Sequence, residues 1–152
     1  MKKVLVVGFA CGVIAVFTFH QALAYALFHQ FPFIKGFSGI GDSFRPPSRG
    51  FNWRPGPPAG LPVVVWMALL GGLWAIVLGM LIRFARLPDL LTGAIFGAVV
   101  VTAFDLSLGA QMRGQAMWAN GDQLVWWRFA LLNTAWGWGT AFLMRPFALS
   151  GR

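Results

Sequence analysis

The sequence has few acidic residues: it contains four aspartates and no glutamate. The aspartates are Asp42, Asp89, Asp105 and Asp122. Most hydrolytic sites use paired carboxylates as general acid and base, and these four do not form such a pair in the sequence. No run supplies the close histidine and carboxylate ligands of a catalytic zinc, and no serine lies in a G-x-S-x-G motif. The sequence therefore predicts no enzyme activity.

Cysteine and histidine are also scarce. The lone cysteine, Cys11, excludes an intramolecular disulfide and a cysteine-cluster metal site, and it is expected to be a small buried side chain. The two histidines, His20 and His29, could ligate haem or chlorophyll, but nine residues at about 100° each place them on opposite faces of one helix. We expect His20, beside Gln21, to be a hydrogen-bonded interior group. No cofactor is predicted, although a lipid or pigment could bind at a subunit contact.

Charged residues make up only 11% of the chain, whereas hydrophobic residues make up 58%. Ordinary soluble domains carry about 25% charge, so this composition argues against a soluble protein. Four apolar runs cover residues 4–28, 61–82, 90–109 and 124–144, and about 20 residues suffice for a helix to cross a bilayer. We predict an all-α integral membrane protein over residues 1–152, with four transmembrane helices in an antiparallel bundle.

The beginning of the chain resembles a secretory signal. Two lysines precede an apolar stretch, and Ala22-Leu23-Ala24 has the pattern of a cleavage site. The apolar stretch nevertheless continues past Ala24 to Phe28. We therefore expect a retained first helix.

Basic residues outnumber acidic ones by twelve to four and lie mostly between the predicted spans. They form no basic stripe and no recognition motif, so nucleic-acid binding is not expected. Contact with anionic lipid headgroups is the simpler explanation. Lys2, Lys3 and the compact Arg83-Phe84-Ala85-Arg86 turn favour termini in the cytoplasm, because positive charge is retained on that side. The expected location is the bacterial inner (plasma) membrane.

The predicted loop over residues 30–60 is rich in proline and glycine, which disfavours a helix or a central strand. It also contains many aromatic residues, including Trp53, which suggests that it lies on the membrane surface or against a partner. Trp118, Trp126 and Trp127 cluster at the start of the fourth run. Tryptophan prefers the headgroup level, so these four residues are predicted interface aromatics.

Small residues recur at four-residue spacing within the runs. Such spacing lets helix backbones approach closely in lipid. The glycines concerned are Gly8 and Gly12 in the first run and Gly93 and Gly97 in the third. In the second run, Gly72 and Gly79 form a related pattern, in which Gly72 follows Ala68 by four residues and Gly79 follows Ala75 by four. They predict helix packing, either within this chain or against another subunit.

Asp105 is the only carboxylate within a predicted span. An ionisable group there is costly and needs a partner or a function. If the third and fourth runs are antiparallel neighbours, Arg128 lies at a similar depth. We therefore predict an intramembrane ion pair between Asp105 and Arg128, with a proton relay and separate headgroup contact by Arg128 as alternatives.

No motif is specific enough to name a family. The scarcity of reactive groups favours a non-catalytic membrane subunit that packs against and stabilises a larger membrane complex, such as an energy-converting one. The alternative is a small homo-oligomeric transporter or channel, with a polar route lined by Asp105, Arg128, Thr102, Asn133 and Thr134. A lipid-processing enzyme using His20 and Asp105 is the third hypothesis.

Overall fold

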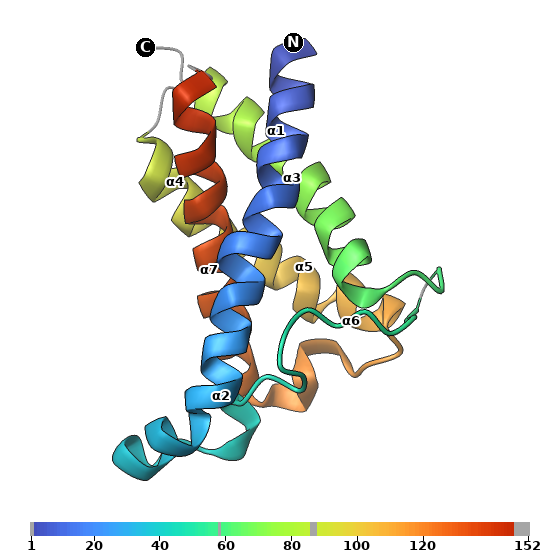
Figure 1. The fold of residues 1–152 in the computed structure, drawn as a ribbon, viewed down its shortest axis with the longest axis vertical. Helices are drawn as coiled ribbons and strands as arrows, with labels where there is room; N and C mark the ends of the chain where they lie inside the picture. Colours follow the sequence, from blue (N-terminus) through green and yellow to red (C-terminus); the bar gives the residue numbers. More distant parts are fainter. Residues whose placement is uncertain (1, 58, 86–87, 148–152) are drawn as a thin grey trace.

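The computed structural model describes residues 2–57, 59–85 and 88–147, and this part of the chain is helical without a β-sheet (Figure 1). An isolated bridge between Pro55 and Pro62 is the only β-type pairing in these residues. The elements are α1 Lys2–Ala15, η1 Val16–His20, α2 Gln21–Ser38, η2 Asp42–Phe44, α3 Val63–Ala85, α4 Asp89–Ile95, η3 Phe96–Val101, α5 Thr102–Leu106, α6 Leu108–Met112, η4 Met117–Gly121, α7 Gln123–Met144 and η5 Arg145–Phe147.

Among the described residues, three helices are long and apolar enough to cross a membrane: Lys2–Ser38, Val63–Phe84 and Asp89–Leu106. The prediction of an all-helical protein with membrane-compatible helices is thereby confirmed. α7 has 22 residues, but Arg128, Asn133 and several other polar residues lower its hydropathy, and it is not among these three.

The first helix is much longer than the predicted run 4–28. α1, η1 and α2 form one helix of 37 residues, and α2 continues through Pro32 to Ser38, where Gly39 ends it with φ 67°. The expectation of a loop from residue 30 was therefore wrong for its first nine residues. Proline removes one helical hydrogen bond, but it did not end this helix. The non-helical connection begins at residue 39.

The third predicted run, 90–109, is interrupted near its end. α4 begins at Asp89 with Pro88 before it, because proline suits a helix start and a carboxylate favours its positive end. η3 continues the helix as a π-helical segment into α5. At Ser107 the backbone leaves the helical region, with φ −107° and ψ −98°, and α6 follows separately.

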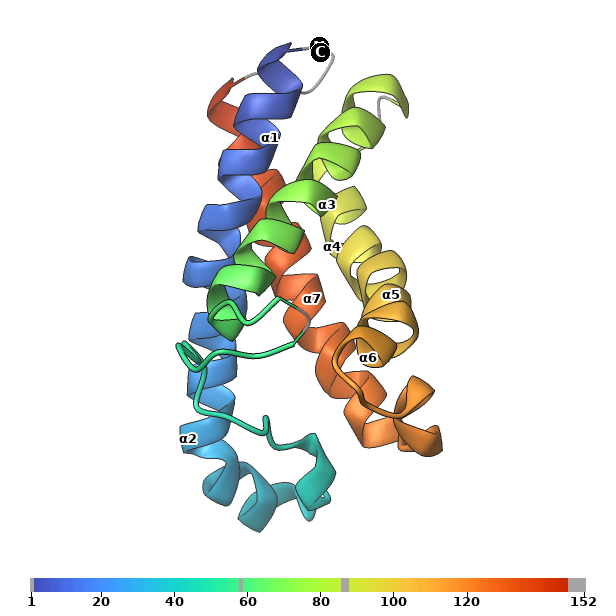
Figure 2. The same ribbon diagram turned by 90° about the vertical axis from the view of Figure 1, so that its right-hand side faces the viewer.

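α7 is the central helix of the molecule (Figures 1 and 2). It packs against α1 and η1 on one side and against α4 and η3 on another, while α3 packs mainly against α1. The buried face of α7 includes Trp136, Gly137 and Thr140. The core is formed where α1, α3 and α7 meet.

Glycines occupy the closest approaches between these helices. A Cβ on Gly12 would collide with the Gly71 carbonyl of α3, and a Cβ on Gly93 or Gly97 would collide with backbone oxygens of α7. Gly72 lies under the Phe9 ring, and a Cβ on Gly8 would lie 3.3 Å from the Ala75 oxygen. The packing within this chain thus already occupies these small-residue faces.

Candidate functional site

Polar side chains gather between α5 and α7, inside an otherwise apolar molecule. Thr102 and Asp105 lie three residues apart on α5 and therefore share one helical face. Asn133 faces them from α7, and Arg113 follows α6. We refer to Thr102, Asp105, Asn133 and Arg113 as the α5–α7 polar cluster.

The amide of Asn133 is the centre of this cluster. Its Nδ2 donates to Asp105 Oδ2 at 2.9 Å and to Thr102 Oγ1 at 3.2 Å, and the Asn133 residue is only 3% exposed. The Thr102 hydroxyl donates in turn to the Gly97 carbonyl at 3.0 Å, five residues earlier. The same carbonyl, in the π-helical segment η3, also accepts a hydrogen bond from the Thr102 backbone N–H. The cluster therefore joins α5 to α7 through donors and acceptors that are already paired.

The charge partner of Asp105 is Arg113. Arg113 Nη1 lies 3.6 Å from Asp105 Oδ1, and Nη2 donates to the Asp105 carbonyl oxygen at 2.8 Å. This contact depends on the break at Ser107, which lets the chain turn back so that the guanidinium reaches a residue eight positions earlier. The Asp105 side chain is 19% exposed to solvent.

The predicted ion pair between Asp105 and Arg128 is therefore wrong. Arg128 Nη1 donates to the carbonyl oxygens of Ser43 at 2.7 Å and Arg45 at 2.8 Å, in the connection that follows α2. Its guanidinium is thus directed at main-chain oxygens of a loop that is 83 or more residues earlier in the sequence. Sequence spacing on two adjacent helices could not reveal this competing acceptor.

Gln21 anchors the same connection at a second point. Its Oε1 accepts a hydrogen bond from the Phe51 backbone N–H at 2.7 Å, and its Nε2 lies 3.3 Å from His20 Nδ1. His20 and Gln21 are both buried. His20 is thus the hydrogen-bonded interior group that the sequence predicted. No hydrogen bond within the described part of the chain joins it to Asp105.

The predicted interface aromatics lie in the connection between α2 and α3, in η4 and in the first turns of α7. Trp53 and Trp127 are exposed, and the Trp126 indole donates to the Trp118 carbonyl at 2.6 Å. Trp118 lies in the turn η4, where three consecutive residues, 118 to 120, have positive φ. The Trp118 and Trp126 rings also pack edge to face, with centroids 5.9 Å apart.

Asp122 is the N-cap residue of α7. Its Oδ1 accepts from the Leu124 and Val125 backbone N–H groups at 3.0 and 3.4 Å. A hydrogen bond with Ser43 is the main influence that lowers the pKa of Asp122, and the two backbone bonds act in the same direction. Asp122 therefore caps the helix and also ties it to the loop.

Comparisons with protein-family models, with curated proteins and with solved structures found no match. The chemistry must therefore be judged from the chain's own residues. No group of three or more metal-ligating side chains occurs among the described residues. The α5–α7 polar cluster holds one carboxylate bonded to an amide and a guanidinium, which is an arrangement suited to joining helices.

Two residues of these polar contacts were not singled out from the sequence. Arg113 lies between the third and fourth predicted runs, outside both, and Gln21 was treated only as a neighbour of His20. The scarcity of carboxylates could have directed attention to Arg113, which is closer to Asp105 in sequence than Arg128 is. Nothing local in the sequence indicated that the Gln21 side chain accepts a hydrogen bond from the Phe51 backbone N–H.

Proposed function

We propose that this chain is a four-span, non-catalytic subunit of a larger complex in the bacterial inner membrane. α7 serves as the fourth span: 22 residues at 1.5 Å each measure about 33 Å, which covers a hydrocarbon core of about 30 Å. Polar residues inside a span normally face protein, and Asn133 and Thr140 of α7 are buried here. The four spans then form the antiparallel bundle expected from the sequence.

The main support for the proposal is the length of the first helix and the exposure of two aromatic side chains near its far end. Its 37 residues measure about 55 Å, so it extends about 25 Å beyond the hydrocarbon core. On that extension, Phe33 is 75% exposed and Phe37 is 90% exposed. The two phenylalanines are four residues apart and share one face of the helix. Exposed aromatic pairs of this kind mark contact surfaces.

The polar residues between the helices support contact rather than catalysis. Asn133 donates to both Thr102 and Asp105, and Gln21 and Arg128 bond to the loop. Groups with such partners would have to break an existing hydrogen bond before acting on a substrate. With cytoplasmic termini, the Phe33 and Phe37 extension lies on the opposite side of the membrane, and the partner would bind there.

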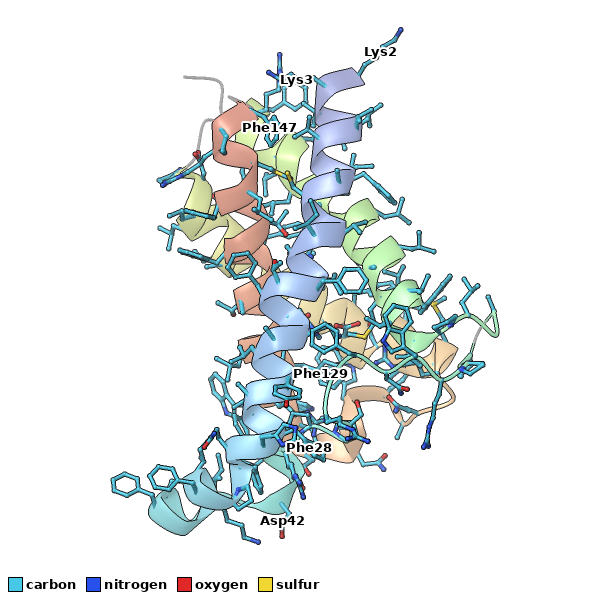
Figure 3. All side chains as sticks on the ribbon, in the orientation of Figure 1. Lys2, Lys3, Phe28, Asp42, Phe129 and Phe147 are labelled. Atoms are coloured by element: carbon cyan, nitrogen blue, oxygen red, sulfur yellow. The ribbon has the colours of Figure 1, made fainter. Side chains whose placement is uncertain are left out.

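The test is purification of the tagged full-length chain in mild detergent, followed by mass spectrometry of what co-purifies. We expect a membrane complex in a fixed ratio to the chain. The Phe33→Ser/Phe37→Ser variant should lower its recovery at least tenfold, because burying each ring contributes about 1.5–3 kcal/mol. Phe147→Ser is the matched control, since this exposed phenylalanine lies at the other end (Figure 3).

Two results would contradict the subunit proposal. One is a stable wild-type monomer without a partner under these conditions. The other is recovery of the complex to the same extent with the double variant and with Phe147→Ser. Labelling of Arg49→Cys only from the cytoplasmic side would instead reverse the proposed orientation, because that residue lies in the connection after α2.

A small transporter is the second candidate. Its support is the Asp105 carboxylate, which belongs to an apolar helix long enough to span and remains partly exposed. Arg128 no longer belongs to this route, because its Nη1 donates to the carbonyl oxygens of Ser43 and Arg45. Proton or solute flux in liposomes that Asp105→Asn abolishes would favour the transporter over the subunit.

A further inference from the structure

A groove opens between the start of α1 and the end of α3. It has a volume of about 220 Å³ and is lined by Val4, Leu5, Met80, Arg83 and Phe84. Four of these five side chains are apolar. Lys2 and Lys3 precede the lining residues of α1, at the end of the molecule opposite Asp42 (Figure 3).

The size of the groove limits what can fill it. Pockets for small ligands are commonly about 300–1,000 Å³, so this groove is too small to enclose one completely. An extended hydrocarbon chain, however, needs to place only part of its length in a groove on the side of a membrane helix. The apolar lining therefore matches a segment of an acyl chain.

The charge at the same place is positive. Arg83 lies in the last turn of α3 and lines the groove. The only carboxylate near this end among the described residues, Asp89, lies 3.7 Å from Arg145 Nε. No described carboxylate lies within ion-pair distance of Arg83, Lys2 or Lys3. A phosphate is a fitting counter-ion for these groups.

We propose that the groove binds an anionic phospholipid, with part of one acyl chain between α1 and α3 and its phosphate on Arg83. Lys2 and Lys3 add to the attraction at headgroup level. A free phosphate would use only the guanidinium and leave Val4, Leu5 and Met80 without a matching surface. With cytoplasmic termini, this end faces the leaflet in which anionic lipids attract basic residues.

The proposal requires membrane embedding but does not require the partner complex. The isolated chain is therefore the proper sample, and a negative result here leaves the co-purification result unaffected. Equally, a chain that lacks a protein partner could still hold this lipid.

The experiment is native mass spectrometry of the purified full-length protein with added phosphatidylglycerol or phosphatidylcholine of the same acyl chains. We expect retention of phosphatidylglycerol at least fivefold above that of phosphatidylcholine. Arg83→Gln should lower phosphatidylglycerol retention about fivefold, since one well-placed base contributes about that factor. Arg54→Gln is the matched control, because it removes an exposed arginine from the connection between α2 and α3.

A second variant tests the groove separately from the charge. Leu5→Trp puts a larger ring at a partly exposed lining position and should lower retention of phosphatidylglycerol without changing the net charge. Unchanged retention by Leu5→Trp would overturn the groove as the acyl-chain site. Equal losses for Arg83→Gln and Arg54→Gln would overturn Arg83 as the phosphate ligand. Displacement by glycerol phosphate at equal concentration would show a free-phosphate site instead.

Discussion

Gly97→Ala tests whether the close approach of η3 to α7 holds this molecule together. A Cβ on Gly97 would collide with the Asn133 carbonyl oxygen and would lie 2.7 Å from its carbonyl carbon and 3.2 Å from Thr134 N. These are backbone atoms of α7, so no side chain can rotate away. The two helices would have to separate, and the bonds from Asn133 to Thr102 and Asp105 would be stretched.

Three contributions determine how much Gly97→Ala should change the free energy of unfolding. Overpacking costs about 1–3 kcal/mol, and weakening one net hydrogen bond costs about 1 kcal/mol. Alanine regains about 1 kcal/mol over glycine through its helix propensity. Gly97→Ala should therefore lower the free energy of unfolding by about 1–3 kcal/mol. Gly36→Ala, with no atom within 4 Å of its new Cβ, should raise it by about 0.5–1 kcal/mol.

The assay is reversible unfolding in mixed detergent and SDS micelles, followed by the fluorescence of the eight tryptophans. The two glycine variants make the same chemical change in helical segments of one chain, so their difference isolates the steric term. We expect them to differ by about 1.5–4 kcal/mol. Unfolding free energies within 0.5 kcal/mol of each other would refute close packing at Gly97.

Three further predictions concern the polar contacts. Asn133→Leu should lower the free energy of unfolding by about 1–3 kcal/mol in the same assay, because it removes the amide donor of Asp105. Gln21→Leu should speed limited proteolysis between residues 39 and 62, because the Phe51 N–H loses its acceptor. The Ser43 hydrogen bond lowers the pKa of Asp122 below its ordinary value of about 3.9, so its stabilising effect is present above that pH and is lost as pH falls through the lowered value. The stability gap between wild type and Asp122→Asn should close in acid, and a gap that widens would contradict this reasoning.

The helices themselves were largely predictable, and the reasons are local. Long apolar runs located the first three helices, and the third run began within one residue of the observed start of α4 at Asp89. The end of the first helix was not predictable from Pro32, because a proline removes one hydrogen bond while the neighbouring turns keep theirs. The fourth predicted run became the helix α7, in which Asn133 donates to Thr102 of α5 and Arg128 donates to the connection after α2.

The candidate site was predictable only in part. Asp105 was correctly singled out as the carboxylate that needs a partner, because an ionisable group in an apolar helix is costly wherever the rest of the chain lies. The predicted charge partner of Asp105 was wrong. Helix spacing placed Arg128 at a similar depth, but it carried no information about the carbonyl oxygens of Ser43 and Arg45, to which Arg128 donates. Gly97 was identified as a packing residue, and the structure places the Asn133 backbone against it.

The sequence by itself determined the helical form of this protein and the compatibility of its long helices with a membrane. Its apolar composition and run lengths leave the backbone groups to bond within helices, and these properties do not depend on how the helices are arranged. Only the tertiary structure decided which polar groups meet. Arg113 reaches Asp105 because the chain breaks at Ser107, and Arg128 reaches the loop because that loop folds against α7. Such pairings depend on distances between residues in the folded chain, and these distances cannot be read from the sequence.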